Sequence, residues 1–329
     1  MRAVVQALQQ GQRFLLGLHA SPDGDTLGAS LGLAAALRSQ GKTVDVVCPD
    51  PIPVTYRFLP GADEVLGWEG VAGPYDALVM LDCGGEDRVH APVSLASLAR
   101  LVVNVDHHAT NPGYGDVVWV EPEAAAVGEM VVELIDALGV KLTPAMALPI
   151  YTAIVTDTGG FRHATTRPRT HRLAARLLEV GVDPGAVSEA LFEQLTLPIL
   201  KLLARGLQAL AVDPDLPVAW IVLTEDDFAQ TGTDPSLLDA TGLIGFARSL
   251  AEVEVGVMMR PSGPGAMRVG LRSKGGVDVS EVARGFGGGG HERAAGCTVE
   301  GDPAWVQARL RTALAAALAR GGSIRAKTP

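Results

Sequence analysis

The chain has 329 residues, about two domains at a typical length of roughly 150 residues, and 47% of them are hydrophobic, enough to form a core in each domain. Charged residues make up 19%, and the 39 glycines and 21 prolines are scattered at turns, which excludes a disordered chain or a fibrous repeat. The net charge of -10 argues against a broad surface that wraps duplex nucleic acid, but it allows a small anionic substrate held by metal ions.

Short apolar runs alternate with amphipathic stretches in the first half of the sequence. Phe14–Leu18 predicts a buried strand, and Thr26 can cap a helix over 27–39 that Gly41 ends. Further valine- and leucine-rich runs of strand length are Val44–Val47, Ala77–Leu81 and Leu101–Val105. Strands that are buried on both faces and alternate with helices indicate an α/β domain, in which a parallel sheet carries helices on both faces.

Helices dominate the middle of the chain. They are predicted at Val127–Leu138, Pro144–Val155, Arg169–Glu179, Pro184–Phe192 and Pro198–Ala209. Strands return at Val218–Leu223, Glu254–Met259 and Met267–Leu271, followed by a glycine-rich turn and a closing helix from about Trp305 to Ala319. We therefore predict a first domain at 1–190, a helical linker at 191–213 and a smaller α/β C-terminal domain at 214–329.

Three of the predicted strands end in carboxylates or histidines, and an apolar helix ends in one more carboxylate. In chain order the residues are His19, Asp23 and Asp25, then Asp82, then Asp106, His107 and His108, and finally Asp157. Ligands bind outside the carboxyl ends of the strands of an open parallel sheet, so we expect these groups to converge. Each one alone is typical of a turn or a helix cap. Their conjunction carries the prediction of a site.

Five carboxylates in one site would repel each other and be costly to desolvate without cations. Oxygen ligands combined with imidazoles suit Mn²⁺ or Mg²⁺, although Zn²⁺ or Co²⁺ could also bind. A carboxylate shared by two groups of ligands suggests a bridged pair of ions roughly 3.5 to 4 Å apart, an arrangement that acidifies a water for the hydrolysis of phosphate esters.

The second domain has a candidate anion site of its own. Arg272 and Ser273 end a predicted strand, and Gly287–Gly290 with His291 follow after a short helix. Glycines let the backbone approach a ligand and point N–H groups at it, and an arginine can hold a phosphate through two parallel hydrogen bonds. A flexible hairpin is the alternative for the glycine run by itself. The nearby Arg-Ser-Lys turn favours a phosphate site.

These motifs resemble those of the DHH phosphoesterase superfamily, which is named for the run seen here as Asp106-His107-His108. The resemblance covers nearly the whole chain, from the His-x-x-x-Asp-x-Asp motif at 19–25 to the Arg-Ser-Lys-Gly-Gly and Gly-Gly-Gly-His-x-x-Ala-Ala-Gly motifs of the DHH-associated C-terminal domain. The length and the segment 156–162 most resemble the branch of bifunctional oligoribonucleases and phosphoadenosine phosphate phosphatases (nanoRNases), rather than the longer RecJ exonucleases.

The resemblance implies a role for each matched residue. One metal ion would be held by His19, Asp23 and Asp82, and a second by Asp25, Asp82, His107 and Asp157. Asp82 would bridge the ions, Asp106 would orient a histidine, and His108 would contact the scissile phosphate or help to protonate the leaving oxygen. In the C-terminal domain, the substrate would be bound by Arg272, Ser273, Gly288, Gly289, Gly290 and His291.

The resemblance further implies a hydrolase with two divalent ions, Mn²⁺ first and Mg²⁺ or Co²⁺ as alternatives. Its substrates would be short single-stranded oligonucleotides or dinucleotides, cleaved to nucleoside monophosphates, and 3′-phosphoadenosine 5′-phosphate (PAP). Such proteins often form homodimers. One alternative is a phosphodiesterase of cyclic or linear dinucleotides such as c-di-AMP or pGpG. Another is a nucleotide-binding regulator without catalysis, which would be expected to lose acidic positions that are all filled here.

One departure from the family concerns residues 124–127, where Ala-Ala-Ala-Val precedes Gly128 and Glu129 and relatives commonly place Ser or Thr. The hydroxyl is lost, but the N–H groups of the helix could still bind a phosphate.

The cysteines and the N-terminus suggest a compartment. Cys48, Cys83 and Cys297 are an odd number without a CxxC pair, which is typical of a reducing cytoplasm. We find no signal-peptide core and no run approaching the 18 or so apolar residues of a membrane span, so we expect a cytoplasmic protein.

Overall fold

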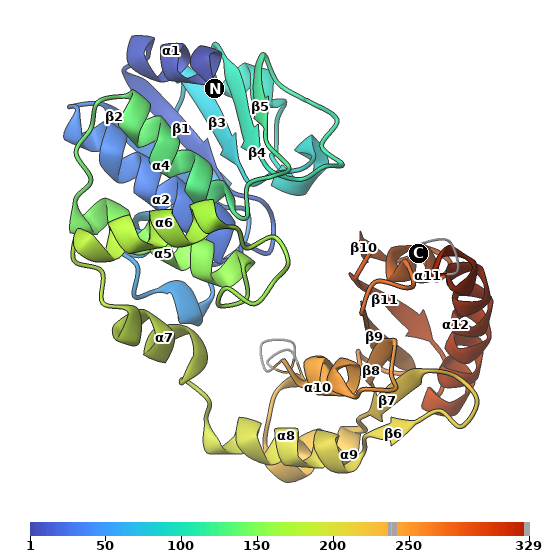
Figure 1. The fold of residues 1–329 in the computed structure, drawn as a ribbon. Coiled ribbons are helices and arrows are strands. Elements are labelled where there is room, and N and C mark those ends of the chain that lie inside the picture. Colours follow the sequence, from blue (N-terminus) through green and yellow to red (C-terminus); the bar gives the residue numbers. More distant parts are fainter. Residues whose placement is uncertain (236–237, 239–241, 326–329) are drawn as a thin grey trace. The chain divides into compact units, whose positions relative to one another are not determined.

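The apolar runs of the first half form a five-stranded parallel sheet in the order β2-β1-β3-β4-β5 (Figure 1). Its strands are β1 (Arg13–Gly17), β2 (Thr43–Val47), β3 (Ala77–Leu81), β4 (Val102–Asp106) and β5 (Val117–Val120). Every residue of β3 and β4 is buried, as expected for central strands of a sheet covered on both faces. The predicted parallel α/β fold is confirmed. The sequence did not predict β5, a short run whose residues are only partly buried or exposed.

The two faces of this sheet pack into separate clusters. Phe14 and Leu16 of β1 belong to the larger core, and Leu15 between them points to the smaller one, as the alternation along a strand requires. The larger core lies under long helices, and α3 and several 3-10 turns lie over the smaller one. The helices of this half are α1 (Arg2–Gln10), α2 (Gly24–Ser39), α3 (Leu95–Leu98), α4 (Val127–Ala137), α5 (Pro144–Asp157), α6 (Pro168–Glu179) and α7 (Pro184–Phe192).

The helix α2 begins three residues earlier than we predicted. Its N-cap is Asp23, whose carboxylate accepts hydrogen bonds from the backbone N–H groups of Asp25 and Thr26, both at 3.1 Å. Thr26, the predicted cap, instead donates its hydroxyl to the carbonyl oxygen of Leu81 at 2.9 Å. The prediction was wrong because a carboxylate is at least as good a cap as a hydroxyl. The Thr26 bond ties the start of α2 to the end of β3.

Helix α5 packs directly on α2 through a row of glycines. Gly24, Gly28 and Gly32 are one turn apart on α2 and therefore face the same way. A Cβ added at Gly28 would lie 2.2 Å from the carbonyl oxygen of Pro149, so the two backbones touch at this point. This close approach brings the C-terminal end of α5 to the N-terminal end of α2.

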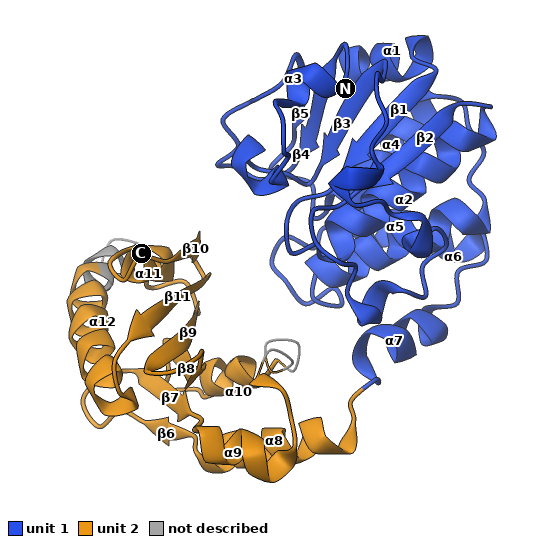
Figure 2. Cartoon of the chain, turned by 180° about the vertical axis from the view of Figure 1, so that it is seen from behind, with its two compact units in different colours: residues 1–194 blue, residues 195–329 orange. Residues whose placement is uncertain are grey.

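The remaining residues form a second unit, Leu195–Pro329, with its own cores (Figure 2). The computed structural model describes residues 1–235, 238 and 242–325, with the backbone only for residues 291 and 321–325. The mixed sheet has the order β10-β11-β9-β8-β7-β6. Its strands are β6 (Ala211–Val212), β7 (Val218–Val222), β8 (Val255–Pro261), β9 (Ala266–Ser273), β10 (Gly289–His291) and β11 (Ala294–Glu300). Its helices are α8 (Leu197–Gln208), α9 (Glu225–Thr231), α10 (Leu243–Ser249), α11 (Val279–Arg284) and α12 (Pro303–Arg325).

This unit is the α/β C-terminal domain that the sequence predicted, but two of its parts differ in detail. The segment 191–213, predicted as a linker, contains α8, which packs on α9 and α10 and belongs to the second unit. The glycine-rich turn contains β10, which forms a hairpin with β11 through pairing of Gly290 with Ala295. In the described part of the chain, no helix combines the length and apolar character needed to span a bilayer. The three cysteine thiols are buried and unpaired.

Candidate metal centre and substrate cavity

The sheet order of the first unit reverses direction between β1 and β3. The next strand in the chain, β2, lies on one side of β1, whereas the later strands β3 and β4 lie on its other side. Connections leave the ends of β1 and β3 in opposite directions at such a point, which opens a crevice where ligands bind. His19 follows β1, Asp82 follows β3, and Asp106 ends β4. The structure therefore brings these strand-end residues to the reversal point.

The other predicted ligands reach the same place from helix ends. Asp23 and Asp25 lie at the start of α2, and Asp157 is the last residue of α5. The Nε2 atom of His107 lies 3.5 Å from Oδ1 of Asp82, 3.7 Å from Oδ2 of Asp157 and 4.0 Å from Oδ2 of Asp25. The Nε2 atom of His19 lies 3.6 Å from Oδ2 of Asp82 and 3.8 Å from Oδ2 of Asp23.

These distances describe shared coordination better than hydrogen bonding. Hydrogen bonds to nitrogen are about 2.7–3.2 Å long, whereas two ligands of an octahedral ion at about 2.1 Å are roughly 3 Å apart when adjacent and roughly 4.2 Å apart when opposite. Ligand atoms of His19, Asp23 and Asp82 lie within 4.8 Å of one another, and so do those of Asp25, His107 and Asp157. Both groups could hold an ion.

Each imidazole has a fixed tautomer that leaves Nε2 for a ligand. The Nδ1 atom of His107 lies 3.0 Å from the carbonyl oxygen of Ala124, and Nδ1 of His19 lies 2.8 Å from that of Ala20. Because a carbonyl oxygen only accepts, each Nδ1 carries the hydrogen. This arrangement is usual for histidines that bind metal ions through the other nitrogen.

Asp82 shows most directly that the site suits a cation. Its backbone is in the left-handed region with φ of 58°, an uncommon conformation for a residue other than glycine. Its Oδ1 atom is buried and makes no hydrogen bond with the described residues, although an ionised carboxylate is costly to bury without partners. A cation shared with the neighbouring imidazoles would satisfy this oxygen, so the residues present fit a divalent ion.

The electrostatics of the metal-free cluster lead to the same conclusion. Burial raises the pKa of Asp25 well above its ordinary value, and the charge of Asp82 adds to the effect. Burial likewise raises the pKa of Asp157 to about 6. Burial opposes protonation of His107, but the neighbouring carboxylates of Asp82 and Asp25 overcome it and raise the pKa to about 11. Without a metal ion, a proton on His107 supplies the positive charge that the carboxylates require.

Asp106 and His108 form a pair beside this cluster. The Nδ1 atom of His108 lies 2.8 Å from Oδ1 of buried Asp106, and the side chain of Asn111 donates to Oδ2 at 2.6 Å. Nδ1 of His108 is also 3.5 Å from Asp82. Asp106 contributes no atom to the ligand groups among the described residues. Its contacts orient the His108 ring next to the bridging position.

The N–H groups at the start of α4 are occupied, contrary to our expectation that they could bind a phosphate. Those of Val127 and Gly128 donate to the two carboxylate oxygens of Asp25, at 2.6 and 2.9 Å. The N-cap, Ala126, has no side chain that could accept these hydrogens. Asp25 therefore satisfies the helix end, and the positive end of the helix dipole stabilises its charge.

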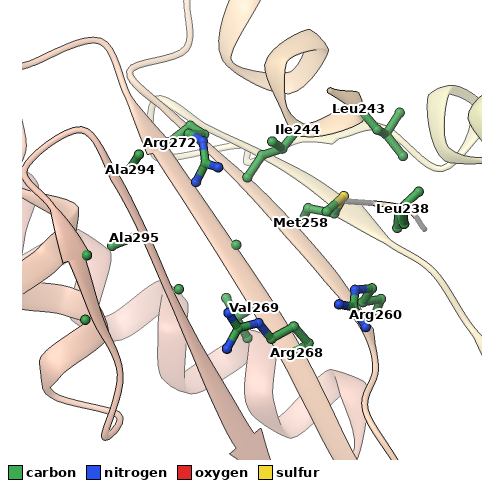
Figure 3. A pocket seen from close by; sticks show the side chains of 14 residues that line it. Leu238, Leu243, Ile244, Met258, Arg260, Arg268, Val269, Arg272, Ala294 and Ala295 are labelled. Carbon is green, nitrogen blue, oxygen red and sulfur yellow. The ribbon is translucent and has the colours of Figure 1, made fainter. Parts of the chain in front are cut away.

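The second unit contains a cavity of about 390 Å³ on one face of its sheet (Figure 3). Arg272 lines it together with Arg260 and Arg268, which are paired across β8 and β9. Apolar side chains of α10 and β8, including Ile244 and Met258, line the same cavity. Gly270 and Gly296 leave the strands bare between the arginines. The cavity therefore combines cationic groups with a partly apolar lining.

The other predicted substrate residues lie in different places. Ser273 follows Arg272 in β9, so it points to the opposite face and is fully buried, a position that does not support the predicted contact. Gly289 and Gly290 line the cavity, whereas a Cβ at Gly288 would meet the backbone of Gly296 at 2.2 Å. Gly288 thus allows close packing against β11. The backbone of His291 belongs to β10, and its side chain lies outside the described part of the structure.

Comparison with known proteins agrees with this geometry. Residues 13–154 match the model of the DHH family, N-terminal domain, and residues 229–320 match the DHHA1 domain. The chain is 37% identical over 309 residues to the bifunctional oligoribonuclease and PAP phosphatase NrnA of Thermus thermophilus, covering 92% of this chain and 89% of that protein. The chain belongs to the DHH family. The protein of the same name in Bacillus subtilis is 27% identical to this DHH-family chain. The match covers 90% of this chain and 92% of the Bacillus subtilis protein.

A solved structure with the same fold is that of an exopolyphosphatase-related protein from Bacteroides fragilis. Its superposition on this DHH-family chain has a TM-score of 0.87 and covers 97% of this chain and 95% of the Bacteroides fragilis chain. The two sequences are 24% identical. At that identity the likeness establishes the fold alone.

Sequence reasoning missed several residues that support the DHH site. The backbone carbonyl oxygen of Arg88 accepts a hydrogen bond at 2.8 Å from the N–H of Ala20, next to His19, and Asn111 holds Asp106. The carbonyl oxygen of Ala124 orients His107. The motif spacing did not indicate these residues, because an alanine carbonyl has no sequence signal and a lone arginine or asparagine in a loop has many uses.

Proposed function

We propose that this DHH-family protein is a phosphoesterase that releases nucleoside monophosphates from short oligonucleotides and removes a phosphate from PAP. The observation that carries the proposal is the convergence of six candidate ligand side chains, with buried Asp82 among them, from four separate segments of the chain. The relatives that match nearly the full length are named for these two activities. When bound, a pair of divalent ions supplies an acidified water and positive charge at the phosphoryl group.

The chain's own residues divide this work. His19, Asp23 and Asp82 would hold one ion, and Asp25, Asp82, His107 and Asp157 the other. The ligand set is rich in oxygen, with two imidazoles and no thiolate, which favours Mn²⁺ or Mg²⁺ over softer ions. We propose Mn²⁺ as the ion, with Mg²⁺ or Co²⁺ as substitutes.

His108 is proposed to act on the substrate. Asp106 fixes its ring and accepts the hydrogen of Nδ1, and Nε2 is the nitrogen proposed to approach a phosphate oxygen or the leaving oxygen. Asp106 is thus a positioning residue for His108. Loss of its charge would disturb the orientation of the ring while leaving both ligand groups in place.

The cavity of the second unit is proposed to bind the part of the substrate that does not react. Arg272 would hold a phosphate near the backbone of Gly289 and Gly290, and a base would lie against the apolar side chains of Ile244 and Met258. A cavity of about 390 Å³ suits a single nucleotide or part of a dinucleotide. We do not include Ser273 in this site. The buried, unpaired thiols fit a reducing cytoplasm.

The test is hydrolysis of labelled dinucleotides with Mn²⁺, with oligomers of increasing length labelled at either end to define the range and the direction of attack. Mononucleotide release, and phosphate release from PAP, are expected from the wild-type protein and not from Asp82→Asn. The absence of mononucleotide product at micromolar enzyme would refute the proposal. Competition among pGpG, PAP and c-di-AMP separates it from the dinucleotide phosphodiesterase alternative.

A further inference from the structure

The segment 121–129 joins β5 to the first turn of α4 and supports two ligands of the proposed second ion. We call it the α4 entry loop. Its Ala124 carbonyl oxygen accepts the hydrogen of His107 Nδ1. Its Val127 and Gly128 N–H groups bind the carboxylate of Asp25. A shift of this loop would therefore move both ligands together.

The middle of the loop has no polar side chain that could fix it. Residues 124–126 are three buried alanines, and the helix N-cap among them makes no side-chain bond. The polar side chains lie on either side of these alanines: Glu121, directly after β5, and exposed Glu123, which pairs with Arg167, come before them, and Glu129 lies in the first turn of α4. Glu129 is only 1% exposed. A carboxylate this deeply buried requires a cation.

Arg169 of α6 supplies that cation and contacts both ends of the loop. One guanidinium nitrogen, Nη1, donates to Glu121, and Nε lies 3.4 Å from Oε2 of Glu129. The remaining nitrogen, Nη2, is 2.9 Å from Oε1 of Glu133, one turn further along α4, and both Nε and Nη2 form ion pairs that lack hydrogen-bond geometry. A planar guanidinium with several donors can hold three carboxylates at once, which a lysine cannot do with the same geometry.

We propose that Arg169 is a positioning residue for the second metal ion, because it fixes both ends of the loop that orients His107 and Asp25. This inference rests on the proposed two-ion function. Without the guanidinium, three carboxylates are left close together, and that of Glu129 is buried. Their repulsion, and the pull of Glu129 towards water, would shift the first turn of α4 and the loop before it. Residues that orient metal ligands typically affect metal affinity by about 10–100-fold when they are removed.

The structure offers a closely matched control on the same helix. Arg176 lies two turns after Arg169 on α6 and also pairs with α4, donating from Nη1 and Nη2 to the carboxylate of Asp136 at 2.9 and 2.8 Å. Asp136 lies at the other end of α4, away from the loop. Arg176→Gln therefore removes an α6–α4 ion pair without touching the α4 entry loop.

The experiment is a Mn²⁺ titration of the full-length protein, followed by the electron paramagnetic resonance signal of free Mn²⁺. We expect Arg169→Gln to weaken one of two bound ions by about 10–100-fold and to leave the other unchanged, since the hydrogen bonds and ion pairs of His19 and Asp23 join segments other than this loop. Arg176→Gln should retain both affinities. Arg169→Lys should recover only part of the lost Mn²⁺ affinity. A lysine keeps the positive charge among the carboxylates, but it lacks the planar arrangement of nitrogens that reaches all three of them.

The outcomes separate the inference from the function on which it rests. If the wild-type protein binds no Mn²⁺, the proposed function fails. If it binds two ions and Arg169→Gln binds them equally well, or if Arg176→Gln loses as much affinity as Arg169→Gln, the positioning role is refuted. Should Arg169→Gln not fold, Glu121→Gln releases one end of the loop while Glu129 keeps its partner, and the same selective weakening is expected. Unchanged binding in that variant would again refute the role.

Discussion

The glycine row between α2 and α5 gives a direct prediction about how packing sets the metal centre. Replacing Gly28 by alanine adds one methyl group at the point where the helices touch. The new Cβ would lie 2.2 Å from the carbonyl oxygen of Pro149, about 1.2 Å short of ordinary van der Waals contact. Neither backbone can yield without moving its helix, so α2 and α5 must separate by a distance of this order.

The magnitude follows from two opposing contributions. Overpacking of a close contact costs about 1–3 kcal/mol, and alanine gains up to about 1 kcal/mol over glycine in a helix. We expect a net loss of about 1–2 kcal/mol in the free energy of unfolding. The shift also moves Asp157 relative to Asp25, and metal ligands tolerate only about 0.2 Å of error. The affinity for the ion of Asp25 and Asp157 should therefore fall. The group of His19, Asp23 and Asp82 should be affected less, because the Thr26 hydrogen bond ties the start of α2 to β3.

Three measurements test this prediction. Urea unfolding gives the free energy of unfolding, hydrogen exchange in peptides from 144–157 reports on the opening of α5, and a Mn²⁺ titration gives the affinities of the two ions. Gly32→Ala is the comparison variant, because it lies on the same face of α2 but its new Cβ would meet Cγ1 of the Ile150 side chain at 2.4 Å and the nearest backbone atom, the carbonyl oxygen of Met146, only at 3.3 Å. Repacking of Ile150 can relieve most of this overlap without separating the helices, so this variant should lose less metal affinity than Gly28→Ala. If Gly28→Ala were as stable as wild type and bound both ions normally, the backbone contact would not control the site.

Three further predictions concern the site itself. Asp82→Asn should lower the affinity for both Mn²⁺ ions in a calorimetric titration, whereas Asp106→Asn should retain both affinities. In steady-state kinetics Asp106→Asn should lower kcat by about 10–100-fold. An equal loss of Mn²⁺ affinity in the two variants would contradict the assignment. Because the pKa of His107 is about 11 without metal and an ion needs the unprotonated ring, Mn²⁺ binding near neutral pH should release a proton, measurable by calorimetry in buffers of different ionisation enthalpy, and the affinity should rise with pH. Below about pH 6 protonation of Asp157 should steepen this dependence, and a pH-independent affinity would argue against both residues as ligands. Arg272→Gln should raise KM for PAP by about 10–100-fold with little change in kcat, and the reverse pattern would place Arg272 in the reaction instead.

The sequence by itself determined the fold class and where the chemistry would gather. Fully buried strands such as Ala77–Leu81 lack the alternation of a half-exposed sheet, so their pattern already required a parallel sheet covered on both faces. The polar residues at strand ends then had only one edge of that sheet at which to meet. The spacing of His19, Asp23 and Asp25 and the Asp106-His107-His108 run involve residues that are close in the sequence. Such motifs can be recognised without knowledge of the tertiary structure.

Only the tertiary structure decided which partners complete each group. The carbonyl of Ala124 on His107, the helix N–H groups on Asp25 and the contact of Gly28 with Pro149 join residues far apart in the chain, and backbone atoms carry no residue-type signal. The tertiary structure also turned Ser273 away from the cavity, because successive residues of a strand face opposite sides and the sequence does not say which side holds the ligand. Residue types indicate what chemistry is available, whereas distance and direction are set when helices and strands pack.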